Sequence, residues 1–164
     1  MLFFGRQEDF RLRLALAHDA LPNPASDRGE QSCCRSGRCC WSGPCQLAPA
    51  DAPKIAAHLG VTVEALFADS LVVDETIDGS ALRVMPRREQ QGGGRFLSDD
   101  ETYDVGPCAF LGADNACEIH AVKPAGGAHY KCWDAATHGE PPGCAWTEEQ
   151  VKALGWDGDR WRDE

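Results

Sequence analysis

The chain has 164 residues, of which 43% are hydrophobic and 26% charged, and its formal net charge at pH 7 is −10. This composition predicts one globular domain over residues 1–164 and argues against a mainly disordered or fibrous chain. The acidic balance argues against nucleic acid as a partner, because neutralising phosphates requires clustered Lys and Arg. No stretch approaches the roughly 20 apolar residues of a membrane span or forms a signal-peptide core, so we expect a cytoplasmic protein with no membrane partner.

Residues 1–32 are expected to form an N-terminal helix followed by a linker. Within positions 8–20, Phe10 and Leu14 keep helical spacing, and the segment is rich in Ala, Leu and Arg, which favour helices. Pro22 ends this pattern, and a polar stretch then leads to the first cysteines.

Five of the nine cysteines fall within thirteen residues: Cys33, Cys34, Cys39, Cys40 and Cys45. Neighbouring cysteines are poorly placed to bridge each other, whereas thiolates close in sequence suit a zinc ion, which takes about four N or S ligands. Gly37 supplies a permissive backbone between the two Cys-Cys pairs. Two alternatives stay open. The thiols could be inert buried groups, or they could belong to a secreted disulfide framework, which the odd cysteine count disfavours.

Two short helices are predicted after this cluster. The first covers residues 51–60, with Asp51 as its N-cap and Gly60 as its terminator. The second runs to Asp69 and is capped by Thr62. The two helices would form a helix–turn–helix unit able to pack over the metal loop.

A β-hairpin is predicted next, because two β-rich segments, 71–77 and 80–85, flank Asp78 and Gly79. The Asp-Gly dipeptide between such segments is typical of a two-residue turn. The glycine-rich stretch 90–94 then predicts a flexible loop, to which we assign no chemistry.

The other four cysteines lie in the last third of the chain: Cys108, Cys117, Cys132 and Cys144. Cys117 and His120 are three residues apart, so both could contact one ion from a single turn. Asp114 and Asn115 predict a tight turn that folds Cys108 back toward Cys117. Cys144, in a Pro-Pro-Gly-Cys sequence, is expected to be a spare thiol.

A C-terminal helix is expected within residues 145–164. Thr147 to Gln150 fits a capping box, Val151 and Leu154 form one apolar stripe, and Gly155 follows. Aromatic burial is the largest hydrophobic contribution of a single residue, so we expect four tryptophans to close the core: Trp133, Trp146, Trp156 and Trp161.

The order of these motifs resembles the YkgJ-like proteins, a cysteine-cluster family described as a zinc- or iron-chelating domain. Residues 33–40 are similar to that family's Cys-x-x-Cys-Gly-x-Cys-Cys block, and residues 55–60 to the helix after it. Residues 108–111 resemble its Cys-x-Phe-Leu element, and residues 117–120 its Cys-x-Ile-Tyr element. The resemblance implies a metal-binding core over residues 33–132.

The chain departs from this family pattern at four positions. Ser36 stands where the family often has its second cysteine, and His120 replaces an aromatic residue. Lys123 replaces an arginine, and Gly127 stands where a cysteine follows the family's Arg-Pro pair. Cys132, five residues later, is the candidate substitute for that missing cysteine.

These observations predict an α+β fold: a small, loop-rich single domain with short helices, a β-hairpin and a cysteine-bound metal centre. The candidate ligands are Cys33, Cys34, Cys39, Cys40, Cys45, Cys108, Cys117, His120 and Cys132. The expected cofactor is zinc or iron, with two tetrahedral sites or an iron–sulfur cluster both compatible with the number of sulfurs. We expect the metal to be structural or sequestered, and we assign no catalytic residue.

Two other functions remain open at this point. An oxidoreductase or enzyme component could use an iron–sulfur cluster, or a coordination position left open by Gly127, although no Ser/His/Asp or carboxylate constellation accompanies it. A binding module could instead present its acidic surface to a basic partner. The sequence does not identify a protein partner, and it favours metal binding without catalysis.

Overall fold

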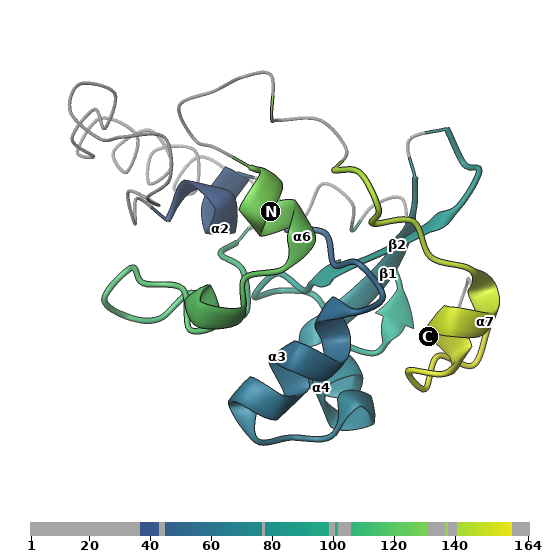
Figure 1. Ribbon diagram of the computed structural model, residues 1–164, viewed down its shortest axis with the longest axis horizontal. Helices are drawn as coiled ribbons and strands as arrows, with labels where there is room; N and C mark the ends of the chain where they lie inside the picture. The colour runs from purple at the N-terminus through teal and green to yellow at the C-terminus, as the bar shows by residue number, and fades with distance from the viewer. Residues whose placement is uncertain are drawn as a thin grey trace, which may run out of the picture.

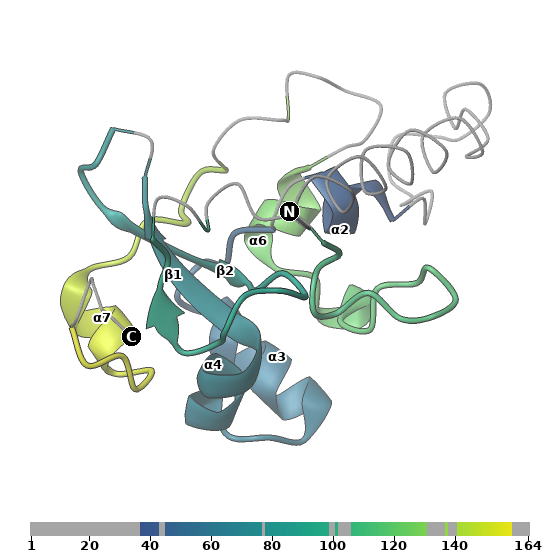
Figure 2. The ribbon, with the colours of Figure 1, turned by 180° about the vertical axis from the view of Figure 1, so that it is seen from behind.

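The computed structural model describes residues 37–42, 45–76, 78–98, 101, 106–130, 137 and 141–158. Within them, short helices surround a three-stranded sheet, which confirms an α+β fold (Figures 1 and 2). The elements are α2 (Arg38–Ser42), α3 (Asp51–Leu59), α4 (Val63–Ser70), β1 (Leu71–Glu75), β2 (Leu82–Pro86), β3 (Arg95–Phe96), the 3-10 helix η2 (His120–Val122), α6 (Ala125–His129) and α7 (Glu148–Lys152). The helix predicted within residues 8–20 lies outside the described residues, as do Trp133 and Trp161.

The sheet has the strand order β2-β1-β3. β1 and β2 are antiparallel, with Val73 opposite Val84, and these two strands are the predicted hairpin. β3 is parallel to β1, with Phe96 opposite Val73. The first four residues of β1 are all buried, because both faces of this central strand are covered. Val73 packs in the main core, and Val72 packs in a smaller cluster with Met85 and Leu97.

The hairpin does not have the predicted two-residue turn, because its strands end at Glu75 and Leu82 and a longer loop joins them. The Asp78 carboxylate organises a wider loop, in which it accepts hydrogen bonds from the Ser80 hydroxyl (2.7 Å), the Ser80 N–H (3.0 Å) and the Thr76 hydroxyl (2.7 Å). A carboxylate that bonds neighbouring donors in this way competes with the tighter turn.

Helices α3 and α4 pack against each other, and α4 also contacts β1 (Figure 1). The Thr62 hydroxyl accepts a hydrogen bond from the Ala65 N–H at 3.1 Å, which confirms the predicted cap of α4. Gly60 ends α3 with a φ of 71°, as predicted. Asp51 is the first residue of α3 and not its N-cap, which is Ala50.

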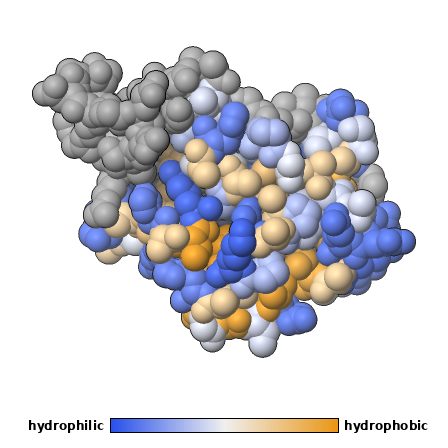
Figure 3. Space-filling model, viewed as in Figure 1, coloured by the Kyte–Doolittle hydropathy of each residue, from blue (hydrophilic) through white to orange (hydrophobic). Residues whose placement is uncertain are grey.

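The main apolar core is formed mostly by residues of α3, α4, the sheet and the C-terminal segment. Its most completely buried side chains include Leu47, Ile55, Leu66, Phe67, Leu71, Val73, Val84 and Val151. Trp146 and Trp156 are buried in the same core, as predicted, and Trp156 stacks on Phe96 with ring centroids 6.1 Å apart. On the face drawn in Figure 3, polar side chains separate the apolar areas of the described surface.

The capping box of α7 is confirmed, since Thr147 and Gln150 exchange side-chain-to-backbone hydrogen bonds. The helix itself ends at Lys152, before the predicted terminator Gly155. The flexible loop predicted at residues 90–94 is instead a close-packed turn: a Cβ on Gly93 would lie 2.3 Å from the Ala68 carbonyl oxygen of α4. None of the described helices is long and apolar enough to cross a membrane.

Candidate metal centre

Helix α2 carries the first two described cysteines. It follows Gly37, which has a φ of 70°, and the Gly37 carbonyl accepts the Cys40 N–H at 2.9 Å. This positive φ favours glycine, and a Cβ on Gly37 would also lie 2.6 Å from the Asn115 side chain, which would have to move. Cys40 is buried, whereas Cys39 and Cys45 are partly buried.

Cys108 reaches α2 through the backbone. Its N–H donates to the Cys40 carbonyl at 2.8 Å, and its residue forms an antiparallel bridge with Arg88, just beyond β2. Sixty-eight positions of chain therefore separate two cysteines that share a direct main-chain hydrogen bond. The sheet edge thus brings the late cysteines to the early ones.

A tight turn then returns the chain to Cys117. Leu111 and Cys117 form an antiparallel bridge, and Gly112 donates to the Ala116 carbonyl at 2.8 Å. Asn115 closes this turn with a φ of 61°, a conformation that asparagine tolerates better than most residues. The predicted fold-back of Cys108 toward Cys117 is confirmed.

The thiols of the two distant segments meet in one cluster, which we call the thiol cluster: Cys39, Cys40, Cys45, Cys108 and Cys117. Cys40 is its centre, because the pKa values of the Cys39, Cys108 and Cys117 thiols all depend on the Cys40 side chain. Cys45 joins through Cys39.

Shared protons set the charge state within the thiol cluster. Hydrogen bonding to Cys108, Cys117 and Cys39 raises the pKa of Cys40. The same contact lowers the pKa of Cys108, and it lowers that of Cys117 to about 7. Cys40 and Cys45 together lower the pKa of Cys39. The cluster thus favours thiolates on several of its sulfurs, and the thiolate is the form that binds metals.

Arg88 holds the two halves of the site together. Its guanidinium donates to the carbonyls of Cys40 (2.9 Å), Trp41 (3.1 Å) and Gly106 (2.9 Å). Its charge is also one of the causes that lower the pKa of Cys108.

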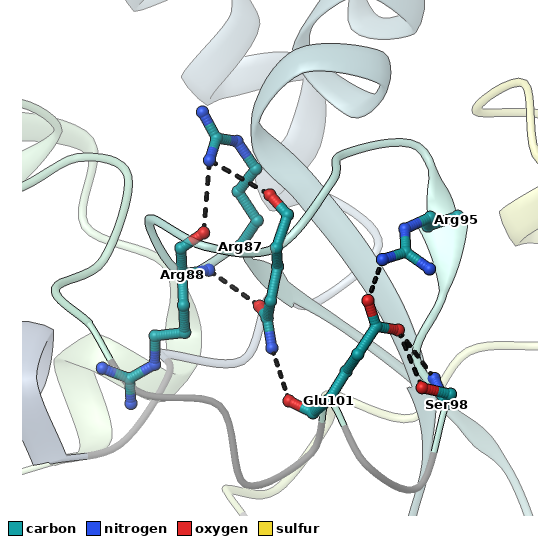
Figure 4. Close-up of polar contacts among 6 residues, drawn as sticks. Arg87, Arg88, Arg95, Ser98 and Glu101 are labelled. Carbon is teal, nitrogen blue, oxygen red and sulfur yellow. Dashed lines mark hydrogen bonds and ion pairs between the residues drawn. The ribbon is translucent and has the colours of Figure 1, made fainter. Parts of the chain in front are cut away.

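The backbone of Arg88 is fixed by the polar network of Figure 4. Its N–H donates to the Gln91 side-chain oxygen at 2.8 Å, and the Gln91 amide donates to the Glu101 carbonyl at 2.9 Å. The Glu101 carboxylate in turn binds Arg95 and Ser98. The sequence carried no motif that pointed to Arg88.

The predicted nitrogen ligand, His120, lies one 3-10 turn after Cys117, and its N–H donates to the Cys117 carbonyl at 3.1 Å. Its Nε2 atom is buried and has no hydrogen-bond partner within the described part of the chain. A buried ring nitrogen without a partner is costly, and ligation of a cation is one way to satisfy it.

Helix α6 places a glycine where the resemblance would place another cysteine. The Gly126 N–H donates to the Gln46 carbonyl at 2.8 Å, which holds α6 against the segment after Cys45. A Cβ on Gly127 would lie 3.0 Å from Cys45 Sγ. Position 127 therefore faces the thiol cluster.

The remaining predicted ligands, Cys33, Cys34 and Cys132, lie outside the described residues. The six described cysteines are free thiols. Cys144 is buried and is not part of the thiol cluster, and its thiol lies 3.6 Å from the Gln46 carbonyl oxygen. Among the described side chains, no group of three Cys, His, Asp or Glu residues has the arrangement of a ready-made metal site.

Comparison of the chain with protein-family models, with curated proteins and with solved structures gives no match. The resemblance to the YkgJ-like proteins therefore depends on the cysteine motifs alone and stays a prediction.

Proposed function

We propose that the protein is a thiolate metal-binding protein of the YkgJ-like type, which holds zinc or iron in the thiol cluster as a structural or sequestered ion. The observation that carries this proposal is the meeting of sulfurs from residues 39–45 with sulfurs from residues 108–117. A disulfide scaffold gives no reason for cysteines of two distant segments to interact as free thiols.

The chemistry of the donor set supports the same function. Thiolate and imidazole are the ligands that zinc and iron–sulfur centres use. The described residues offer five free thiols in the cluster and, three positions after Cys117, the buried Nε2 of His120, which has no hydrogen-bond partner among them. A cation would take the place of the protons that the thiols share. Binding would then release protons and stabilise the segments that carry the ligands.

The short elements around the thiol cluster support a structural role for the metal. Helices α2 and α6 have five residues each, and η2 has three. Isolated helices of this length are unstable in water, so their folding depends on tertiary contacts and on bound ligands. Ligation across the cluster would tie all three elements together.

The test is elemental analysis and thiol counting on the full chain prepared without oxygen. We expect stoichiometric zinc or iron, thiols that become reactive when a chelator is added, and a lower melting temperature after chelation. Cys144→Ser is the control, since its thiol lies outside the cluster, and it should keep the metal content of the wild type.

The colour of the sample separates the metals. A brown, reducible chromophore would identify an iron–sulfur cluster and would favour the electron-carrying alternative, whereas a colourless zinc-loaded protein would favour a structural ion. Protein without metal whose cysteines form disulfides would refute the proposal.

A further inference from the structure

The side chain of Lys123 lies over the backbone of Gly127. A Cβ built on Gly127 would lie 3.0 Å from Lys123 Cγ and 3.1 Å from Lys123 Cε, at the same time as it lies 3.0 Å from Cys45 Sγ. Gly127 is itself buried, and Lys123 is partly buried. The lysine stem and the sulfur therefore border the same small space, which exists because residue 127 has no side chain.

The Lys123 stem and the Cys45 sulfur lie against the same glycine, so the ammonium at the end of this stem lies close to the thiol cluster. Arg88 approaches the cluster from the other segment, where its guanidinium donates to the Cys40 carbonyl at 2.9 Å. Two cations thus face the cluster in a chain whose net charge is −10.

A buried metal site made of thiolates requires positive charges near it. When about four thiolates bind a divalent ion, the site carries a net negative charge, and burying that charge is unfavourable unless a cation lies near it. Arg88 uses its guanidinium to hold three carbonyls, so its position is fixed by the backbone. Lysine is a compact point charge on a flexible stem, which suits a place beside a sulfur.

We propose that Lys123 is a positioning residue of the thiol cluster: its ammonium is a built-in counter-ion for the metal-bound thiolates, and Gly127 makes the room for its stem. This inference depends on the proposed metal site and adds a residue that is not itself a ligand. Outer-shell partners of metal ligands commonly contribute about 10- to 100-fold in affinity.

Four variants test the charge separately from the packing. Lys123→Met keeps the stem without the charge, Lys123→Gln also removes the charge, and Lys123→Arg keeps it. Lys54→Met is the matched control, because Lys54 is exposed on α3. Zinc affinity is measured by competition with a chromophoric chelator, and the melting temperature of each chelated protein reports on packing alone.

We expect Lys123→Met and Lys123→Gln to bind zinc about tenfold more weakly than the wild type, with Lys123→Arg close to wild type and Lys54→Met unchanged. In the presence of chelator, the Lys123→Met protein and the wild type should have the same melting temperature. Equal zinc affinities for Lys123→Met and Lys54→Met would refute the counter-ion role of Lys123 but would not affect the proposed metal site. A wild type that binds neither zinc nor iron would overturn both proposals.

Discussion

Two regions of the molecule are built in different ways. The sheet with α3 and α4 has regular elements of up to nine residues and a continuous apolar core that includes Phe67 and Val73. The region of α2, η2 and α6 has elements of three to five residues, adds only a few residues such as Cys40 and Ile119 to that core, and is joined by backbone hydrogen bonds and by the Arg88 guanidinium. Apolar burial accounts for the first region, and in the second, whose elements are shorter, the proposed metal at the thiol cluster would add stability.

The largest effect is expected from the apolar region. Phe67 is 2% exposed, so Phe67→Ala should destabilise the protein by about 3–5 kcal/mol through lost burial and the cavity that remains. The exposed Val61 provides the control, and Val61→Ala should have little effect. Denaturant unfolding in the presence and absence of a chelator should show the same loss for Phe67→Ala. A loss that disappears on chelation would mean that the two regions are not built differently.

Cys40→Ser is the corresponding change in the thiol cluster. Removing its central thiol should destabilise the metal-loaded protein by roughly 2–4 kcal/mol, because loss of a metal is among the strongest single-residue effects. Chelation of the wild type should reproduce most of this loss, and Cys144→Ser should not. Identical unfolding curves for Cys40→Ser and Cys144→Ser would show that the cluster does not stabilise its region.

Asp51 links the two regions and should have an intermediate effect. Its carboxylate accepts the Ala48 N–H and the Ala125 N–H, both at 2.8 Å, which joins the start of α3 to the start of α6. Asp51→Ala leaves both donors without this acceptor, so we expect a loss of about 1–3 kcal/mol. Hydrogen exchange should show faster exchange in α6 than in β1, with Asp69→Ala, an exposed aspartate on α4, as the control. Uniform acceleration throughout the sheet would contradict the local role.

The smallest effect concerns the hairpin loop, far from the cysteines in sequence. Hydrogen bonds from Ser80 and Thr76 lower the pKa of Asp78 from 3.8 to about 2. Because the folded-state pKa is depressed, this carboxylate contributes stability above pH 3.8, and the contribution is lost as the pH falls through about 2. Asp78 is fully exposed, so the contribution is small.

The check is the difference in melting temperature between the wild type and Asp78→Asn, followed as the pH is lowered with chelator present. The wild-type advantage should shrink below pH 3.8 and disappear near pH 2. A difference that does not change with pH would show that the carboxylate charge is not involved.

The sequence was most informative where one local signal decides the structure. Thr62 and Thr147 cap their helices as predicted, and Gly60 and Asn115 adopt the backbone conformations expected of them. The fold-back of Cys108 toward Cys117 followed from such a signal as well. In each case a single side chain, or the absence of one, favours one conformation whatever surrounds it.

Predictions failed where tertiary contacts compete with local ones. Asp51 bonds a distant N–H on α6 and begins its helix, and the Asp78 side chain widens the hairpin loop beyond the Asp-Gly dipeptide. The parallel strand β3 has only two residues and no pattern that could reveal it. The cation Arg88 meets Cys40 only through the fold, so spacing along the chain could not assign it to the site.

The most direct test of the central claim is cobalt(II) binding by paired variants of the full chain. One variant carries Cys39→Ser and Cys40→Ser, the other Cys108→Ser and Cys117→Ser, and Cys144→Ser is the control. The account predicts that the wild type and the control develop thiolate-to-cobalt charge-transfer absorbance and that both paired variants lose most of it. Full absorbance in either paired variant would contradict a site built by sulfurs from both segments.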